Sequence, residues 1–437
     1  MRRRRADIFQ RFFRTEAIGG LVLVSFAALG LALANSPWAD IYNRIWATRF
    51  AFGLGDHALT LSLRDWINDG LMAIFFLLVG LEIKRELIAG ELASVQKAVL
   101  PLAAAFGGMA VPALIYFCFN PRGPAAQGWG IPMATDIAFA LGALALLAPG
   151  APTGAKVFLA ALAIADDMGA VLVIAIFYVG TIHVDALVTA GALTLLLAIL
   201  NKTKVVKLWP YLLTGLALWY FVHHSGVHAT IAGVALAMMI PSRTCIDAAE
   251  FSREAHGLLE RFDRKETGDL LVLTSKGQQQ SLFALNRASQ AVTAPILRLE
   301  HSLHRFSAFF VMPLFALANA GVKIGLPAAH HNVTLGVLAG LIVGKPLGIT
   351  AASWLAVKFG AARLPAGTGW AALHGASWLA GIGFTMSLFI TVLAFQDAAL
   401  IEAAKLAIVG ASILAALVAA VVFRWCGREA EGAPPSQ

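Results

Sequence analysis

Four ionisable residues lie within long apolar stretches, where charged side chains are costly. Asp136 lies in ATDIAFALG, Asp166 and Asp167 are adjacent in AIADDMGAV, and Lys345 lies in LIVGKPLGI. At the centre of a membrane helix, each would cost about 2.5 to 3.5 kcal/mol on insertion scales. Together they would cost roughly 10 to 14 kcal/mol if uncompensated, comparable to the stability of a typical domain. We therefore expect them to face one another or a water-filled cavity.

The charge balance of these residues predicts a cation site. Three carboxylates accompany one ammonium, which leaves an acidic excess that a cation or protons can neutralise. The oxygens of Asp166, Asp167 and Thr135, with nearby free carbonyls, suit a hard monovalent ion such as Na+ or Li+. Because two adjacent carboxylates cannot both stay ionised cheaply, protons and this ion would compete for the same oxygens. A buried ion pair that only holds helices together is the alternative, but it leaves one of the adjacent aspartates unexplained.

The composition places these residues in a membrane protein. The chain of 437 residues is 59% hydrophobic and 13% charged, with a mean hydropathy of +0.76. A soluble core could not bury so much apolar surface. The long apolar runs, without period-two alternation, favour helices over a barrel. The formal charge of +8 reflects an excess of Lys and Arg, which in a membrane protein indicates the topology of its loops and not nucleic-acid binding. The three cysteines lie far apart and indicate neither a disulfide framework nor a zinc site.

The apolar windows predict an all-α integral membrane protein with about twelve transmembrane helices. They fall near 17–34, 66–83, 98–119, 127–147, 155–180, 185–200, 209–223, 227–240, 304–320, 333–357, 370–394 and 399–423. The Arg-rich N-terminus and alternation then place most basic loop residues, and both termini, in the cytoplasm. These residues are Lys84, Arg85, Lys97, Lys156, Lys202, Lys204, Lys207, Arg243, Lys358, Arg363, Arg424 and Arg428.

A cleaved signal peptide is an alternative reading of the N-terminus. Four arginines precede an apolar run that ends in Ala32-Leu33-Ala34, a plausible cleavage pattern. The run from Ala17 to Ala34 is longer than a usual signal core, and Glu16 flanks it. These features favour a retained first helix.

Two expected helices carry residues that interrupt them. Gly128, Gly130 and Pro132 fall near the start of 127–147, and Gly381 and Gly383 fall within 370–394. Paired interrupted helices, one in each half of the chain, are the sequence indication of a transporter's midplane ion site. Glycines that only allow close helix packing are the alternative.

Two segments lie between the expected spans of a single domain, 1–437. In 48–63, Thr60 and Ser62 alternate with Leu59, Leu61 and Leu63 beyond a Gly53 to Gly55 turn, which predicts an external β-hairpin. The polar segment 242–297 is predicted to be cytoplasmic. Phe251, Ala255, Leu258 and Phe262 share one helical face there, so it forms either a helix lying against the membrane or a flexible loop.

Over almost its whole length, the sequence resembles the NhaA-type sodium/proton antiporters. The resemblance rests on the motifs WINDGLMAIFFLLVGLEIKREL, PMATDIAFALG, LAIADDMGAVLVIAIFY, GVHATIAGV, LEHSLH, PLFALANAGV, GKPLG and GFTMSLFI. Members of this family are inverted-repeat transporters. The resemblance therefore implies inverted-topology repeats with two discontinuous helices, near 127–147 and 370–394. It also implies a multi-pass protein of the bacterial inner membrane.

The resemblance also assigns roles to particular residues. It implies that Asp166 and Asp167 bind Na+ and protons, while Asp136, Thr135 and Lys345 balance charge where the broken helices cross. Asp166 is the expected partner of Lys345. A cytoplasmic network is implied to sense pH, and it consists of Glu82, Arg85, Glu86, Glu300, His301 and His304. Without the family, the two histidines could equally be a generic pair at the membrane interface. His228 is expected to be a packed or hydrogen-bonded residue.

The function implied is electrogenic, pH-regulated exchange of Na+ or Li+ for protons by alternating access. No cofactor is expected beyond the transported ions, and a homodimer is expected to form through the external hairpin. The long 242–297 segment departs from the pattern of compact members of the family, so pH regulation in this chain is expected to differ from theirs.

Two enzymes and a passive channel are the competing interpretations. Adjacent aspartates could serve a membrane prenyltransferase or an intramembrane aspartyl protease. The first needs a second Asp-rich motif and the second needs another Asp in a Gly-flanked setting, and neither is found. A lysine facing the acidic excess at a single site favours alternating access over a channel. The chain is therefore not predicted to be an enzyme.

Overall fold

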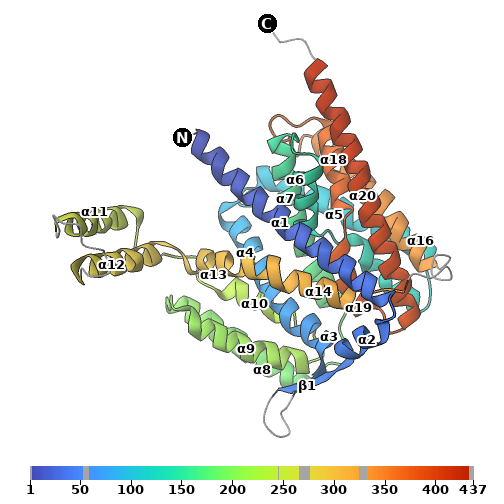
Figure 1. Ribbon diagram of the computed structural model, residues 1–437, viewed down its shortest axis with the longest axis horizontal. Helices are drawn as coiled ribbons and strands as arrows, with labels where there is room; N and C mark the ends of the chain where they lie inside the picture. The colour runs from blue at the N-terminus through green and yellow to red at the C-terminus, as the bar shows by residue number, and fades with distance from the viewer. Residues whose placement is uncertain (1, 53–58, 245, 265–275, 324–331, 433–437) are drawn as a thin grey trace.

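The computed structural model is a bundle of helices with one small two-stranded sheet (Figure 1). It describes residues 2–52, 59–244, 246–264, 276–323 and 332–432. The first part of the chain forms α1 (Arg2–Ala34), α2 (Ala39–Ala47), β1 (Arg49–Phe52), β2 (Leu59–Ser62), α3 (Leu63–Asp65), η2 (Trp66–Leu71), α4 (Met72–Ala89), α5 (Val95–Phe119), η3 (Pro124–Met133), α6 (Ile137–Leu147) and α7 (Thr153–Phe177).

The remainder continues the helical pattern. It forms α8 (Val184–Lys202), α9 (Leu208–His224), α10 (Ile231–Met239), α11 (Ala248–Arg264), α12 (Lys276–Val292), α13 (Pro295–Phe306), η4 (Ser307–Val311), α14 (Met312–Asn319), α16 (Asn332–Ala339), η5 (Gly340–Gly344), α17 (Lys345–Lys358), α18 (Trp370–Ala380), α19 (Phe384–Ala394) and α20 (Ala398–Gly432). The predicted helical class is thus confirmed.

Several helices have the length and composition needed to cross a membrane. Among the described residues, five helices qualify alone, or up to eight if each bent pair is one span. The five are Val95–Phe119, Thr153–Phe177, Val184–Lys202, Asn332–Lys358 and Ala398–Trp425. On α8, Val188 and Leu195 are 66% and 62% exposed, as expected for side chains that face lipid. The count of twelve stays a prediction.

Glycine-mediated packing brings the helices of the site together. α5 packs along α17, and a Cβ on Gly107 or on Gly348 would collide with the backbone of the other. A Cβ on Gly108 would lie 3.7 Å from Cδ of Lys345. Small residues at such a contact let helix backbones approach closely. This approach positions the start of α17 in the interior, beside α5.

The predicted hairpin is present. β1 and β2 are antiparallel, with Arg49 opposite Ser62 and Phe52 opposite Leu59. Ser62 ends the hairpin and begins α3, because its Oγ accepts a hydrogen bond from the Asp65 amide at 3.1 Å in a capping box. The Gly53 to Gly55 turn lies outside the described residues. The external location of the hairpin stays a prediction.

The polar segment 242–297 contains two helices that project from the bundle beyond α13 (Figure 1). α11 packs against α12. The predicted face of α11, with Phe251, Ala255, Leu258 and Phe262, is half-buried. The two ends of the segment meet at its base, where the amide of Ile246 donates to the Ala291 carbonyl at 3.4 Å. The segment is therefore a helical hairpin on a narrow base in the described residues.

Candidate ion-binding site

Two bent helix pairs cross in the interior of the bundle. η3 and α6 meet at 46° around Ala134 to Asp136, and α18 and α19 meet at 44° around Gly381 to Gly383. The Asp136 amide donates to the Ile382 carbonyl at 2.7 Å. These breaks leave backbone groups without partners in their own helices, and the crossing lets each break bond to the other.

Asp136 lies between two helix N-termini. Its Oδ1 accepts the Phe139 amide at 3.0 Å and so caps α6. Its Oδ2 accepts the amide and hydroxyl of Thr385, at 3.1 and 2.5 Å, in the first turn of α19. Helix N-termini carry partial positive charge, which favours an anion at this position. Both carboxylate oxygens are thus engaged by the protein itself.

Lys345 connects three elements of the site. It follows the π-helical turn η5 and is fully buried. Its Nζ donates to Oδ2 of Asp166 at 2.6 Å and to Oγ1 of Thr135 at 2.9 Å. The Thr135 hydroxyl in turn donates to the Ala380 carbonyl at the end of α18, at 2.8 Å. The predicted pairing of Lys345 with Asp166 is therefore confirmed.

Asp166 and Asp167 lie in the middle of α7 and are almost completely buried. The Oδ1 atoms of both residues accept no hydrogen bond from any described residue. Buried polar atoms without protein partners are rare in native proteins, so these two oxygens are candidates to bind an ion or water. No three His, Cys, Asp or Glu side chains gather as a metal site in the described part of the chain. The two aspartates with the Thr135 hydroxyl are the oxygen donors gathered here.

The six residues assigned to a pH-sensing network are only partly brought together. Arg85 forms ion pairs with Glu300 and, at 3.2 Å, with Glu86, joining α4 to α13. His304 Nδ1 lies 3.8 Å from Oε1 of Glu82. His301 is exposed and makes none of these contacts. One Glu300 oxygen is buried without a hydrogen-bond partner among the described residues. The structure thus places five of the six residues in two separate groups, Arg85 with Glu86 and Glu300, and His304 with Glu82.

A polar cluster near the start of α4 was missed by the sequence analysis. Asp69 lies 3.7 Å from His223 Nδ1 and 3.6 Å from His228 Nε2. His228 also bonds to the Thr230 hydroxyl at 2.8 Å, which agrees with its predicted role as a hydrogen-bonded residue. Asp69 is a carboxylate inside the expected span 66–83, and that signal could have identified it.

Thr385 was also missed as a component of the site. It lies in the GFTMSLFI motif, two residues after Gly383. A hydroxyl directly after a helix break was the available signal, because the first amides of the following helix need a polar partner. Its contact with Asp136 joins positions 249 residues apart.

The apolar bundle and its buried charged site define an integral membrane protein of the transporter class, in which ion sites lie where broken helices cross. The sequence model of the Na+/H+ antiporter 1 family matches residues 10–423, and the chain belongs to this family.

Curated relatives match almost the entire chain. The Na(+)/H(+) antiporter NhaA of Oleidesulfovibrio alaskensis is 48% identical, over 97% of this chain and 96% of its own. The NhaA antiporter of Acidithiobacillus ferrooxidans is 50% identical, over 94% of this chain and 95% of its own. The solved structure of the sodium proton antiporter MjNhaP1 from Methanocaldococcus jannaschii covers 96% of both chains, with a TM-score of 0.47 and 13% identity.

Proposed function

We propose that this protein exchanges Na+ or Li+ for protons across the bacterial inner membrane, by alternating access at Asp166 and Asp167. The observation that carries the proposal is the pair of adjacent, buried carboxylates, each with an oxygen that has no partner among the described residues. Lys345 compensates Asp166, so the site retains acidic excess for a cation or protons. The names of the relatives, Na(+)/H(+) antiporters, support Na+ and protons as the exchanged ions.

The exchange is electrogenic in this proposal. Two carboxylates can carry two protons in one state and share a single Na+ in the other. A cycle of that kind moves a net charge across the membrane. Lys345 and Asp136 balance the charge where the broken helices cross. Lys345 does so through its bond to Asp166, and Asp136 does so by accepting hydrogen bonds at the N-termini of α6 and α19.

The proposed membrane arrangement has twelve spans in inverted-topology repeats, with both termini cytoplasmic. The two bent pairs, η3 with α6 and α18 with α19, are the discontinuous helices of the two repeats. The β1–β2 hairpin lies outside and joins two protomers. α11 and α12 lie in the cytoplasm, as the positive-inside pattern predicts.

Sodium-induced proton movement in proteoliposomes, recorded across a pH series, tests the function. In an antiporter, Na+ leaves the side to which it is added and protons move toward that side, in strict dependence on the Na+ gradient. A passive channel would dissipate either gradient alone, and an enzyme would show neither response. Absence of coupled movement in a folded preparation would contradict the proposal.

Apparent sodium affinity should improve as pH rises, because fewer protons occupy the shared oxygens. Where both carboxylates carry a proton the improvement can approach about a hundredfold per pH unit, and where only one does it is at most about tenfold, until the site is deprotonated. The measurement is the Na+ concentration for half-maximal proton movement between about pH 6 and pH 9. A constant value over this range would exclude competition at one site.

The double variant His301→Gln/His304→Gln should shift the pH midpoint of exchange without eliminating it. Neither histidine is among the proposed binding oxygens, so each can act only through a coupled equilibrium. His304 lies beside Glu82, whereas His301 is exposed. His301→Gln alone is the matched control and should leave the midpoint nearly unchanged. Complete loss of exchange in folded protein would show that the histidines belong to the transport site.

Deleting the α11–α12 hairpin should leave ion exchange intact. Its base is narrow, since the Ile246 amide and Ala291 carbonyl lie 3.4 Å apart, so two glycines can replace residues 247–290. The comparison is the initial rate and sodium dependence of exchange beside the parent. A folded deletion variant without exchange would mean that the hairpin takes part in transport.

A further inference from the structure

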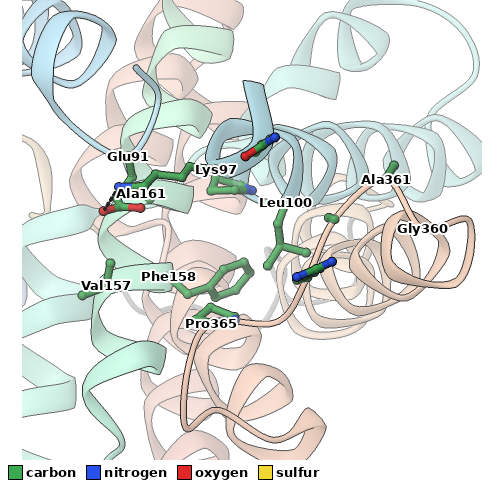
Figure 2. Close-up of a pocket in the computed structure, with 13 residues that line it drawn as sticks. Glu91, Lys97, Leu100, Val157, Phe158, Ala161, Gly360, Ala361 and Pro365 are labelled. Atoms are coloured by element: carbon green, nitrogen blue, oxygen red, sulfur yellow. Dashed lines mark ion pairs between the residues drawn. The ribbon is translucent and has the colours of Figure 1, made fainter. Parts of the chain in front are cut away.

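A cavity of about 580 Å³ lies apart from the aspartate site (Figure 2). Its walls come from the first turns of α5, the beginning of α7 and the segment that follows α17. Lys97, Leu100, Phe158 and Arg363 are among its lining residues. The volume is within the range of small-molecule binding sites in proteins. Of these segments, α7 also carries Asp166 and Asp167, and α5 packs along α17, which begins at Lys345.

The charged groups of the cavity leave a positive excess. Lys97 pairs with Glu91 at 3.6 Å, but the side chains are 60% and 43% exposed, so this pair is weak. Arg363 is exposed and makes no ion pair or hydrogen bond with the described residues. Neither α5 nor α7 has a side-chain cap at its N-terminus, and these ends add partial positive charge. The cavity therefore favours an anion.

Exposed apolar side chains flank the cavity in the sequence. Val95 and Phe359, which directly precede the lining residues Gln96 and Gly360, are 79% and 80% exposed. Near the end of α17, the Lys358 ammonium lies 4.4 Å from the centre of the exposed Trp354 ring. Tryptophan and lysine are typical of the boundary between hydrocarbon and headgroups. The cavity that favours an anion therefore lies near the level of the lipid headgroups.

We propose that this cavity binds the phosphate headgroup of an anionic phospholipid, held by Lys97 and Arg363. Guanidinium and ammonium groups are the usual partners of phosphate oxygens, and basic pockets between transmembrane helices bind such headgroups. The acyl chains lie against the exposed face of α5 and against Phe359. A soluble anion would gain nothing from these exposed apolar side chains. The bound lipid links α7 to the segment that follows α17. Asp166 lies on α7, and Lys345 is the first residue of α17.

The test measures lipid binding to purified full-length protein in detergent, so it does not depend on transport. Melting temperature is recorded while phosphatidylglycerol is added, with phosphatidylcholine as the neutral lipid. Phosphatidylglycerol should raise the melting temperature of the parent more than phosphatidylcholine does. In Lys97→Gln/Arg363→Gln, the phosphatidylglycerol concentration that gives half of the maximal stabilisation should rise by at least about tenfold. Lys202→Gln/Arg243→Gln removes two exposed basic residues outside the cavity and should match the parent.

Two further measurements test the site and the identity of its ligand. Glu91→Gln removes the carboxylate that competes for Lys97 and should strengthen phosphatidylglycerol binding several-fold. Equal binding by the parent and by Lys97→Gln/Arg363→Gln would overturn the site. Stabilisation of the parent by inorganic phosphate alone, lost in that double variant, would identify a soluble anion and overturn the lipid assignment.

Discussion

Asp167→Asn and Asp166→Asn should each reduce sodium-driven proton movement to background. Each substitution removes one negative charge from a site whose acidic excess is needed to hold a cation. It also removes a carboxylate oxygen that carries a proton in the proposed cycle. Proton movement is measured in proteoliposomes at matched protein amounts, with Asp185→Asn, an exposed carboxylate on α8, as the control. Normal exchange by both site variants would refute the aspartate site.

The two variants should differ in stability, although both lose transport. Asp167→Asn leaves the bond between Lys345 and Asp166 in place, so its melting temperature should stay near that of the parent. Asp166→Asn leaves Lys345 buried without its carboxylate, which is destabilising. The melting temperatures of the two purified variants therefore separate the binding role of Asp167 from the structural role of Asp166.

The charged centre was predictable because the membrane makes burial of charge expensive. Asp136, Asp166, Asp167 and Lys345 could be identified one by one, since each interrupts an apolar run. The same reasoning requires that they compensate one another. Charge thus predicts that Lys345 pairs with a carboxylate, but charge alone does not select Asp166 from the three aspartates.

The contacts of Asp136 could not be derived in this way. Its partner Thr385 is uncharged, and their contact depends on how two helix breaks cross in space. Sequence patterns predict that a helix is interrupted, whereas the crossing results from the packing of all surrounding helices. The π-helical turn before Lys345 has the same origin, because its sequence GLIVG has no feature that distinguishes it from an ordinary apolar helix.

The histidines show the limit of spacing arguments. His301 and His304 lie one turn apart and were treated as a pair, yet only His304 approaches Glu82. On a helix, residues three apart differ in direction by about 60°, since each residue turns about 100°. That difference places one side chain toward α4 and leaves the other exposed. Which of them turns inward depends on the position of α4.

Lys345→Ala should lower the stability of the protein substantially. In the parent, Nζ bonds to Asp166 and Thr135, and the side chain is fully buried. Truncation leaves the Asp166 carboxylate unpaired at membrane depth, which costs on the order of 3 to 5 kcal/mol unless it takes up a proton. The void left by a large buried side chain adds to this cost. The measurement is the melting temperature of the purified variant in one detergent.

Lys345→Arg is the matched variant, because it keeps the positive charge while it changes the shape of the group. It should lose less stability than Lys345→Ala and retain part of the exchange activity. Some loss is expected, since Cδ of Lys345 lies near Gly108 on the closely packed α5 and leaves little room for a guanidinium. Lys202→Ala, at an exposed position, reports the effect of losing a lysine without burial. A melting temperature and exchange activity of Lys345→Ala equal to those of the parent would show that the pair with Asp166 does not support the site, and the electrostatic basis of the proposed exchange would fail.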